Sequence, residues 1–401
     1  MNGASATIQS IMQVGWQAYE RLNPLPGYVR HAIAALLACR TAVLGGHVQG
    51  CPDGHFTRHW YNSCKHRLCP QCAYIQVERW LLKQKARLIG TDHYHLIFTI
   101  PHQLNDLWLL NVKVMADLLF QAVRDTIFDF MEDDKHVGGT PGIIASLHTW
   151  SQTIIQHIHI HCLVTGGGLA PDGTWRTPRR DSLLPYQAVM VKFRGKLLDL
   201  IDKAINRGDI QLPDDMSPQK WINLRNKLGR KIKWNFNIRE RYKHGEGVVT
   251  YLARYLRGGP IGNHRIISCD DKEVTFSYRI NGEESNKKGL MSLPINQFIQ
   301  RYLLHVPVPH SRVVRYYGLY APAKKAELEK CRELFGQLPV VETEFLTWQE
   351  FCEKQGEDHP ELCPECGKKL LFLNEIPTKR KHELKFPISG GQAIFCDTAT
   401  W

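Results

Sequence analysis

One stretch, QHIHIHCLV at residues 156–164, alternates polar and apolar residues with a period of two. Successive side chains of a β-strand point to opposite faces, so this stretch predicts a strand with His157, His159 and His161 on one face. Two imidazoles roughly 7 Å apart along a strand can converge on one divalent metal ion, with a third ligand from a neighbouring element. The alternative is a solvent-facing strand side, where histidines are common. Because an apolar run and three glycines follow the histidines, we favour the metal-binding interpretation.

A second pair with the same spacing, His93 and His95, opens an earlier apolar stretch that ends at Pro101. This pair lies at the start of the expected strand and has no glycine-rich exit. We therefore interpret it as structural.

The elements expected around these strands alternate between helix and strand. Residues 104–132 and 184–206 have helical periodicity, whereas residues 143–150, 157–165 and 264–303 have the pattern of strands. Further helices are expected at residues 1–38, 75–88 and 248–257. This order predicts an α+β fold with a small metal-stapled domain in front.

The charge of the chain is strongly basic, with a formal net charge of +12 and 43% hydrophobic residues. Residues 219–257 hold eleven Lys and Arg against two Glu, so this short segment carries most of the surplus. Basic side chains neutralise phosphates, and the interleaved Trp221, Trp234, Phe236 and Tyr242 are suited to stacking on unpaired bases. The segment predicts a strand-binding surface whose candidate DNA contacts are Lys227, Arg230, Lys231, Lys233, Arg239, Arg241, Lys243, Arg254 and Arg257.

A cluster of five cysteines within residues 39–72 predicts a structural zinc site, because zinc binds four soft or borderline ligands at tetrahedral angles. The alternative is that these cysteines are buried in a core without a metal, but five cysteines in so short a segment argue against it. Which four ligands close the tetrahedron stays open, as does a second metal. His47, His59 and His66 are additional candidates. The main candidates are Cys39, Cys51, His55, Cys64, Cys69 and Cys72.

A second Cys-x-x-Cys pair, Cys363 and Cys366, resembles a zinc knuckle near the end of the sequence. A lone pair of this kind is a weak signal, so a second zinc there stays an open alternative. The partners that could complete it lie at irregular distances and are Cys352, His359, His382 and Cys396.

Two tyrosines, Tyr251 and Tyr255, are spaced to share one face of the expected helix. Core packing is the ordinary explanation for such a pair. The adjacent basic segment favours a second one, in which the phenols attack DNA. A metal that polarises the scissile phosphate would assist this attack, and the product would be a 5′-phosphotyrosine with a free 3′-hydroxyl. Two tyrosines allow two successive transesterifications.

Five stretches in combination resemble the two-tyrosine HUH transposases of the insertion-sequence-91 family. The resemblance implies an N-terminal zinc-binding domain and an HUH endonuclease domain with a central antiparallel sheet flanked by helices. It also implies rolling-circle-like transposition through single-stranded DNA, with His159 and His161 as the metal pair and Tyr251 and Tyr255 as the nucleophiles. The catalytic ion would be magnesium or manganese. The stretches are CRT at 39–41 with LGGH at 44–47, YNSCKHRLCPQC at 61–72, HIHCLVTGGG at 159–168, YLARY at 251–255 and RYYGL at 315–319.

Two positions depart from the family's pattern. Cys51 is followed by His55 where such modules usually have a second Cys-x-x-Cys, so His55 stands as a replacement for a cysteine. The third metal ligand is not set by the motif. Gln152, seven residues before His159, has a spacing that resembles replication-initiator HUH nucleases, and His148 is the alternative. We expect Gln152.

The domain organisation expected from these motifs is linear. It comprises a helical segment at 1–38, a zinc-binding domain at 39–90, a nuclease domain at 91–320 with an inserted basic helical region at 180–245, and a helical tail at 321–401.

The expected location is the cytoplasm, at the nucleoid when DNA is bound, because no apolar stretch reaches roughly 18 residues and no secretory signal is visible. The expected partners are single-stranded DNA at the element ends and at the target, with no membrane. Two other functions remain as alternatives, a replication-initiator or relaxase-like HUH nuclease and a zinc-containing DNA-binding protein without catalysis. No Gly-x4-Gly-Lys-Ser/Thr loop, as a helicase domain would carry, occurs in the chain.

Overall fold

The computed structural model of the chain divides into two compact units. The first unit comprises Met1–Arg79, Arg257–Val306 and Glu344–Trp401, and the second comprises Trp80–Leu256 and Pro307–Thr343. The residues that the structure describes are 6–179, 183–242, 245–253, 259–280, 287–341, 345, 347, 349–350, 352 and 359–379.

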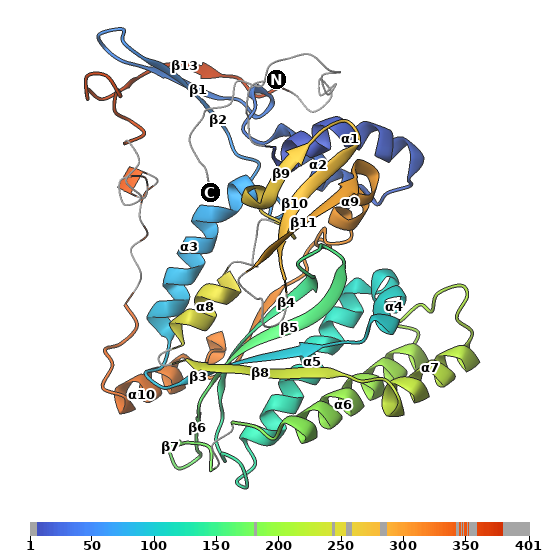
Figure 1. Ribbon diagram of the computed structural model, residues 1–401. Helices are drawn as coiled ribbons and strands as arrows, with labels where there is room; N and C mark the ends of the chain where they lie inside the picture. The colour runs from blue at the N-terminus through green and yellow to red at the C-terminus, as the bar shows by residue number, and fades with distance from the viewer. Residues whose placement is uncertain are drawn as a thin grey trace. The chain divides into compact units, whose positions relative to one another are not determined.

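The second unit is built on a five-stranded antiparallel sheet with the strand order β12-β4-β5-β3-β8 (Figure 1). The predicted histidine-containing strand is β5, and it is central, with β4 and β3 as its neighbours. Its register opposes Cys162 to Ala145 on β4 and to Leu96 on β3. The five strands are β3 (His93–Thr99), β4 (Gly142–Trp150), β5 (Gln156–Thr165), β8 (Asn235–Tyr242) and β12 (Val314–Gly318).

One face of this sheet forms the apolar core of the unit. Ile158 and Ile160 of β5 are almost fully buried in it, and Phe98 of β3 has ring centroids of Phe193 and Phe236 within 5.0 Å and 4.7 Å. Helices α5 and α6, which contact each other, contribute buried residues to this core. The α-helices that lie wholly in this unit are α4 (Asn105–Leu110), α5 (Val112–Met131), α6 (Tyr186–Asn206), α7 (Pro218–Arg230), α8 (Glu246–Ala253) and α10 (Lys325–Leu334).

The helix expected at residues 104–132 is interrupted at Asn111, which separates α4 from α5. The Asn111 side chain donates to the carbonyl of Leu107 at 2.9 Å and to that of Gln211 at 2.7 Å, and it accepts from the amide of Gln211 at 2.8 Å. Asparagine side chains compete with helical hydrogen bonding in this way. The apolar periodicity runs through the break, which is why the sequence predicts one helix.

The basic region predicted as helical at residues 180–245 includes a strand. Residues 235–242 form β8, which pairs antiparallel with β3 at an edge of the sheet. The prediction missed this strand because its inward residues Phe236 and Ile238 alternate with polar ones only briefly, next to a charge-rich helix.

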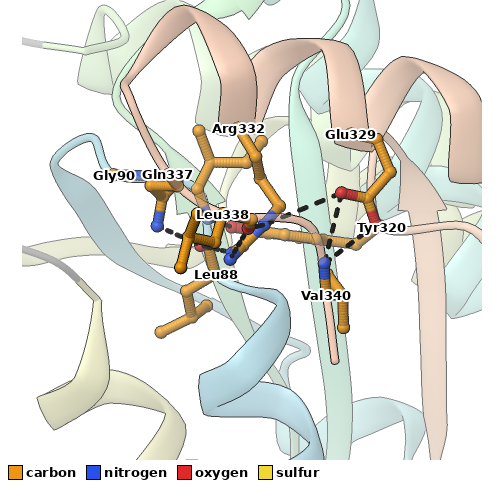
Figure 2. A network of polar contacts seen from close by, with 9 residues as sticks. Leu88, Gly90, Tyr320, Glu329, Arg332, Gln337, Leu338 and Val340 are labelled. Carbon is orange, nitrogen blue, oxygen red and sulfur yellow. Dashed lines mark hydrogen bonds and ion pairs between the residues drawn. The ribbon is translucent and has the colours of Figure 1, made fainter. Parts of the chain in front are cut away.

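Helix α10 is fastened to the segment that leads into β3 by a buried arginine, as Figure 2 shows. Arg332, 8% exposed, donates to the carbonyls of Leu88 and Leu338 at 2.7 Å each. The Gln337 side chain accepts from the amide of Gly90 at 2.6 Å and donates to the Leu88 carbonyl at 3.1 Å. Charge-assisted bonds of this kind order the entry into β3.

The described residues of the first unit form two small antiparallel sheets and the N-terminal helices. Helix α1 begins with a capping box in which Thr7 and Ser10 satisfy each other's backbone amides. Gly15 of α1 faces Ile295 and Ile299 of α9, where a larger side chain would collide. The elements are α1 (Ile8–Leu22), α2 (Gly27–Ala38), β1 (Gly46–Gly50), β2 (Thr57–Tyr61), β9 (Ile266–Cys269), β10 (Glu273–Arg279), β11 (Lys288–Pro294), α9 (Ile295–Leu303) and β13 (Leu371–Ile376), with the unit boundary inside α3 (Pro70–Arg87).

The division into units differs from the linear domains expected from sequence. Residues 257–306, expected in the nuclease domain, belong with the N-terminal residues because α9 packs on α1. Residues 295–303, expected as strand, form helix α9. The C-terminal segment also returns to the first unit, where β13 pairs with β1 as the third strand of a β13-β1-β2 sheet. Among the described helices, none has the length and apolar character needed to cross a membrane.

Candidate functional site

Three histidines gather on the face of the second unit's sheet opposite the apolar core. His148 of β4 lies directly across from His159 of β5, and His161 is the next residue on the same face of β5. Their ligand nitrogens all lie within 4.8 Å of one another. The ring of His148 has its centroid 4.2 Å from that of His161 and 5.2 Å from that of His159. This arrangement fits three imidazole ligands of one divalent metal ion.

The protonation of these histidines suits a metal ligand. His159 Nδ1 lies 2.7 Å from the carbonyl oxygen of His157, which can only accept, so Nδ1 carries the proton and Nε2 presents its lone pair. Burial lowers the pKa of His159 to about 3 and holds the pKa of His148 well below its ordinary value. Both rings are therefore neutral near pH 7, which is the form that binds metals.

His95, interpreted from sequence as structural, contacts this group. Its Nε2 forms a 2.7 Å hydrogen bond with Nδ1 of His161, and both side chains are 2% exposed. In the register, His161 opposes Ile97, so His95 lies one step along the same face of β3. The period-two spacing of His93 and His95 was the available signal. Strand pairing, which places β3 next to β5, was needed to interpret it.

The third member of the histidine group is His148, whereas the sequence analysis preferred Gln152. Gln152 lies in the turn between β4 and β5, outside both strands. Antiparallel pairing instead opposes His148 to His159. A motif spacing along the chain does not contain this cross-strand register, which is why His148 stood only as the alternative from sequence; Gln152 as a metal ligand stays a prediction.

Tyr251 lies beside the histidines. Helix α8, which carries it, contacts strands β3, β5 and β8. The Tyr251 ring centroid is 5.0 Å from that of His95 and 5.2 Å from that of His161. The neighbouring residues Val248, Val249 and Leu252 are buried and hold the helix in place. The second predicted nucleophile, Tyr255, lies outside the described residues.

The basic segment has a different character from the one expected. Its aromatic residues Trp221, Trp234 and Phe236 are buried, and the Trp221 indole donates to Asp202 at 3.0 Å. They pack in the core, so they do not stack on bases as the sequence suggested. Among the described residues of this segment, the exposed cations are Lys220, Lys227, Arg230, Lys231 and Lys233. Of the other predicted DNA contacts, the structure describes only the backbone of Arg239 and Arg241, and Lys243, Arg254 and Arg257 lie outside the described residues.

Four of the predicted zinc ligands form one compact group in the first unit, made of Cys39, Cys64, Cys69 and Cys72. Cys39 ends α2, and Cys72 lies in the first turn of α3. The sulfur of Cys39 lies 3.3 Å from that of Cys72 and 3.6 Å from that of Cys69. A zinc ion with bonds of about 2.3 Å to sulfur has tetrahedral edges of about 3.8 Å, so this group fits a structural zinc.

The other two predicted zinc ligands, Cys51 and His55, do not belong to this group. They lie with Cys363 and Cys366 in a separate cluster. The sequence assigned them to the first site because they are neighbours along the chain. The β1–β2 hairpin carries them away from it, towards the C-terminal segment. Cys352 and His359, considered as partners of the C-terminal pair, are outside the cluster, and His382 and Cys396 lie outside the described residues.

Two stretches of the chain match known protein families. Residues 11–100 match the family model of a transposase zinc-binding domain, and residues 142–327 match that of a putative transposase. The putative transposase y4qJ of Sinorhizobium fredii (strain NBRC 101917 / NGR234) is 31% identical over 358 residues, which cover 86% of this chain and 89% of that protein. The chain belongs to the insertion-sequence-91 (IS91) family of transposases.

A second relative of this IS91-family transposase is the transposase for insertion sequence element IS801 of Pseudomonas savastanoi pv. phaseolicola. It is 26% identical over 353 residues, covering 86% of this chain and 83% of that protein. Among solved structures, the metal-bound complex of the conjugative relaxase TrwC with oriT DNA matches at 12% identity, over 40% of this chain and 71% of that chain. Its TM-score of 0.23 is too low to support a structural argument.

Proposed function

We propose that this transposase cleaves and joins single-stranded DNA through 5′-phosphotyrosine intermediates. In this proposal His148, His159 and His161 bind the catalytic ion, magnesium or manganese, and Tyr251 and Tyr255 are the nucleophiles. The observation that carries the proposal is the position of Tyr251, whose ring centroid lies 5.2 Å from that of His161, a member of the histidine cluster, and 5.0 Å from that of His95, which contacts His161. A tyrosine that served only as core packing would have no reason to adjoin such a cluster.

The histidine cluster supplies the electrostatic part of the chemistry. A divalent ion held by these histidines would polarise the scissile phosphate and stabilise the charge that develops during attack. When His161 binds through Nε2, its Nδ1–H donates to His95 Nε2, and this bond holds the ring in the binding orientation. Imidazole donors are softer than Mg²⁺ prefers, so we expect Mn²⁺ to support cleavage at the lower concentration.

The tyrosine supplies the covalent part. Its phenol oxygen attacks the scissile phosphorus, the bond from phosphorus to the 3′ oxygen breaks, and the phenol proton is lost as the 3′ oxygen gains one. The downstream strand is then linked to the protein through its 5′ phosphate. When a 3′-hydroxyl attacks this link, a phosphodiester forms and the phenol is released, so joining needs no external energy source. A second phenol at Tyr255 allows the donor and target steps to follow each other.

Exposed cations at the end of α7 and before β8 would hold the strand. Lys227 and Arg230 lie in the last turn of α7, and Lys231 and Lys233 follow before β8 begins. Lysine and arginine side chains in such a row neutralise successive phosphates without reading sequence. We assign these four residues to binding single-stranded DNA at the element ends and at the target.

The test uses the full chain and a 3′-labelled single strand from its element's end, because the downstream fragment carries the protein. Incubation with Mn²⁺ is followed by denaturing electrophoresis. We expect a metal-dependent, SDS-resistant adduct that is lost in the Tyr251→Phe, Tyr255→Phe double variant. Tyr186→Phe, an exposed tyrosine on α6, is the matched control and should keep the adduct.

Two results would count against the proposal. An adduct that survives in the double variant would place the nucleophile elsewhere. Binding of the correct strand without any adduct in the wild-type protein would return the tyrosines to a packing role and favour DNA binding without this chemistry.

A further inference from the structure

We propose that Cys51, His55, Cys363 and Cys366 form a second zinc site, which fastens the C-terminal segment to the β1–β2 hairpin. Their four ligand atoms lie within 4.8 Å of one another, although Cys51 and Cys366 are 315 residues apart. The Cys51 sulfur lies 3.5 Å from the Cys366 sulfur and 3.7 Å from Nδ1 of His55. These distances match the edges of a zinc tetrahedron, about 3.8 Å between sulfurs. A disulfide would need about 2.05 Å.

The backbone around the two ligand pairs has the same design. In each turn, the amide of the first cysteine donates at 2.8 Å to the carbonyl five residues further on, from Cys51 in one turn and from Cys363 in the other. Each turn also has a glycine in the left-handed region, Gly54 with φ 79° and Gly367 with φ 69°. Left-handed backbone favours glycine, and it tightens the turn so that both ligands of the pair point the same way. Two such turns facing each other supply two ligands each.

Contacts beside the cluster join the same two turns. Lys368 forms an ion pair with Asp53 at 2.7 Å, and Leu370 packs with Phe56 and the two buried cysteines, Cys51 and Cys363. An ion pair with exposed partners is worth little in stability, so these contacts align the turns and do not by themselves hold them. A metal ion bound by ligands from both turns would supply most of the free energy that holds them together.

The donor set of the cluster identifies the chemical class of its ligand. Three thiolates and one imidazole suit a borderline-soft cation with tetrahedral geometry, which is zinc among the common biological divalent ions. The cluster shares no residue with the group of Cys39, Cys64, Cys69 and Cys72. The chain is therefore expected to carry two structural zinc ions.

The consequence for the fold lies in the strand that follows the second turn. Residues Leu371–Ile376 form β13 and pair with β1, opposing Gly50 to Leu371 and Gly46 to Ile376. The paired strand exposes Leu371, Phe372 and Leu373 by more than half, so side-chain burial contributes little to holding it there. We infer that this third strand forms only when zinc joins the two turns.

The first experiment measures zinc per full-length chain by mass spectrometry after removal of loosely bound metal. The wild-type chain is expected to carry two ions in the four-cysteine and Cys51 clusters, and the Cys363→Ser, Cys366→Ser double variant one. Cys269→Ser, a half-buried cysteine of the same unit outside both clusters, should leave two. Amides of β13 should exchange with deuterium at least about tenfold faster in the double variant, as expected when a local unit loses its support.

Equal zinc content in the wild-type chain and the double variant would overturn the proposal. A second measurement covers the case in which the double variant does not fold. Cobalt substituted into the wild-type chain should show the sum of a four-sulfur and a three-sulfur, one-nitrogen spectrum. His55→Cys should convert the second component to the four-sulfur type while keeping two ions. An unchanged cobalt spectrum in His55→Cys would exclude His55 as a ligand.

Discussion

Replacing His95 by phenylalanine should weaken divalent-metal binding although every one of the three proposed ligands is kept. A flat aromatic ring is kept, but the 2.7 Å hydrogen bond to His161 Nδ1 is lost in a site where both residues are 2% exposed. Loss of such a supporting bond costs a metal site about 10- to 100-fold in affinity, which corresponds to about 1.4–2.8 kcal/mol. A buried donor left without its acceptor costs about 1–3 kcal/mol, which agrees with this range.

The measurement is a Mn²⁺ titration of adduct formation, with Mn²⁺ binding to the zinc-loaded protein followed by calorimetry in parallel. The half-saturating Mn²⁺ concentration should rise about 10- to 100-fold in His95→Phe, and the rate should recover at high Mn²⁺. His95→Gln keeps a hydrogen-bonding group, so its half-saturating Mn²⁺ concentration should lie between those of the wild type and His95→Phe.

The matched control is His93→Phe, two residues earlier on the same face of β3. His93 is fully buried and its Nε2 lies 2.6 Å from the Tyr320 hydroxyl, away from the histidine group. The His93→Phe variant should be less stable than the wild type but should show the same Mn²⁺ titration curve of adduct formation. If His95→Phe also keeps that curve and only melts at a lower temperature, the role assigned to His95 is wrong.

Three further outcomes are expected. His161→Ala should abolish metal-dependent nicking on denaturing gels, while the zinc content of the first unit stays unchanged because its ligands are separate. The double variant Lys231→Gln, Lys233→Gln should make the negative slope of log affinity against log salt for single-stranded DNA less steep by about 1.4, measured by fluorescence anisotropy. Lys203→Gln, at a lysine paired with Asp199 on α6, should leave the slope unchanged. Phe98→Ala should reduce the unfolding free energy of the second unit by about 3–5 kcal/mol in a urea titration, because the fully buried ring packs against two other aromatic rings. A loss below about 1 kcal/mol would show that this core relaxes around the cavity.

Local patterns in the sequence determined the parts of the site that depend on neighbouring residues. The alternation around His159 and His161 predicted a strand and placed both imidazoles on one face, as β5 has them. The spacing of Cys69 and Cys72 predicted a ligand pair, and both lie in the four-cysteine group. Strand alternation and ligand spacing follow from the geometry of a few consecutive peptide units, so a short window of sequence contains them.

Only the tertiary structure decided which residues from distant parts of the chain meet. The register between β4 and β5 brought His148 to the histidine group, and the pairing of β3 with β5 brought His95 to His161. The return of the C-terminal segment to β1 reassigned Cys51 from the first cysteine group to a cluster with Cys366. These outcomes depend on how the apolar faces of whole elements pack, and one register step or one strand order changes every cross-strand neighbour at once. No local spacing records that choice.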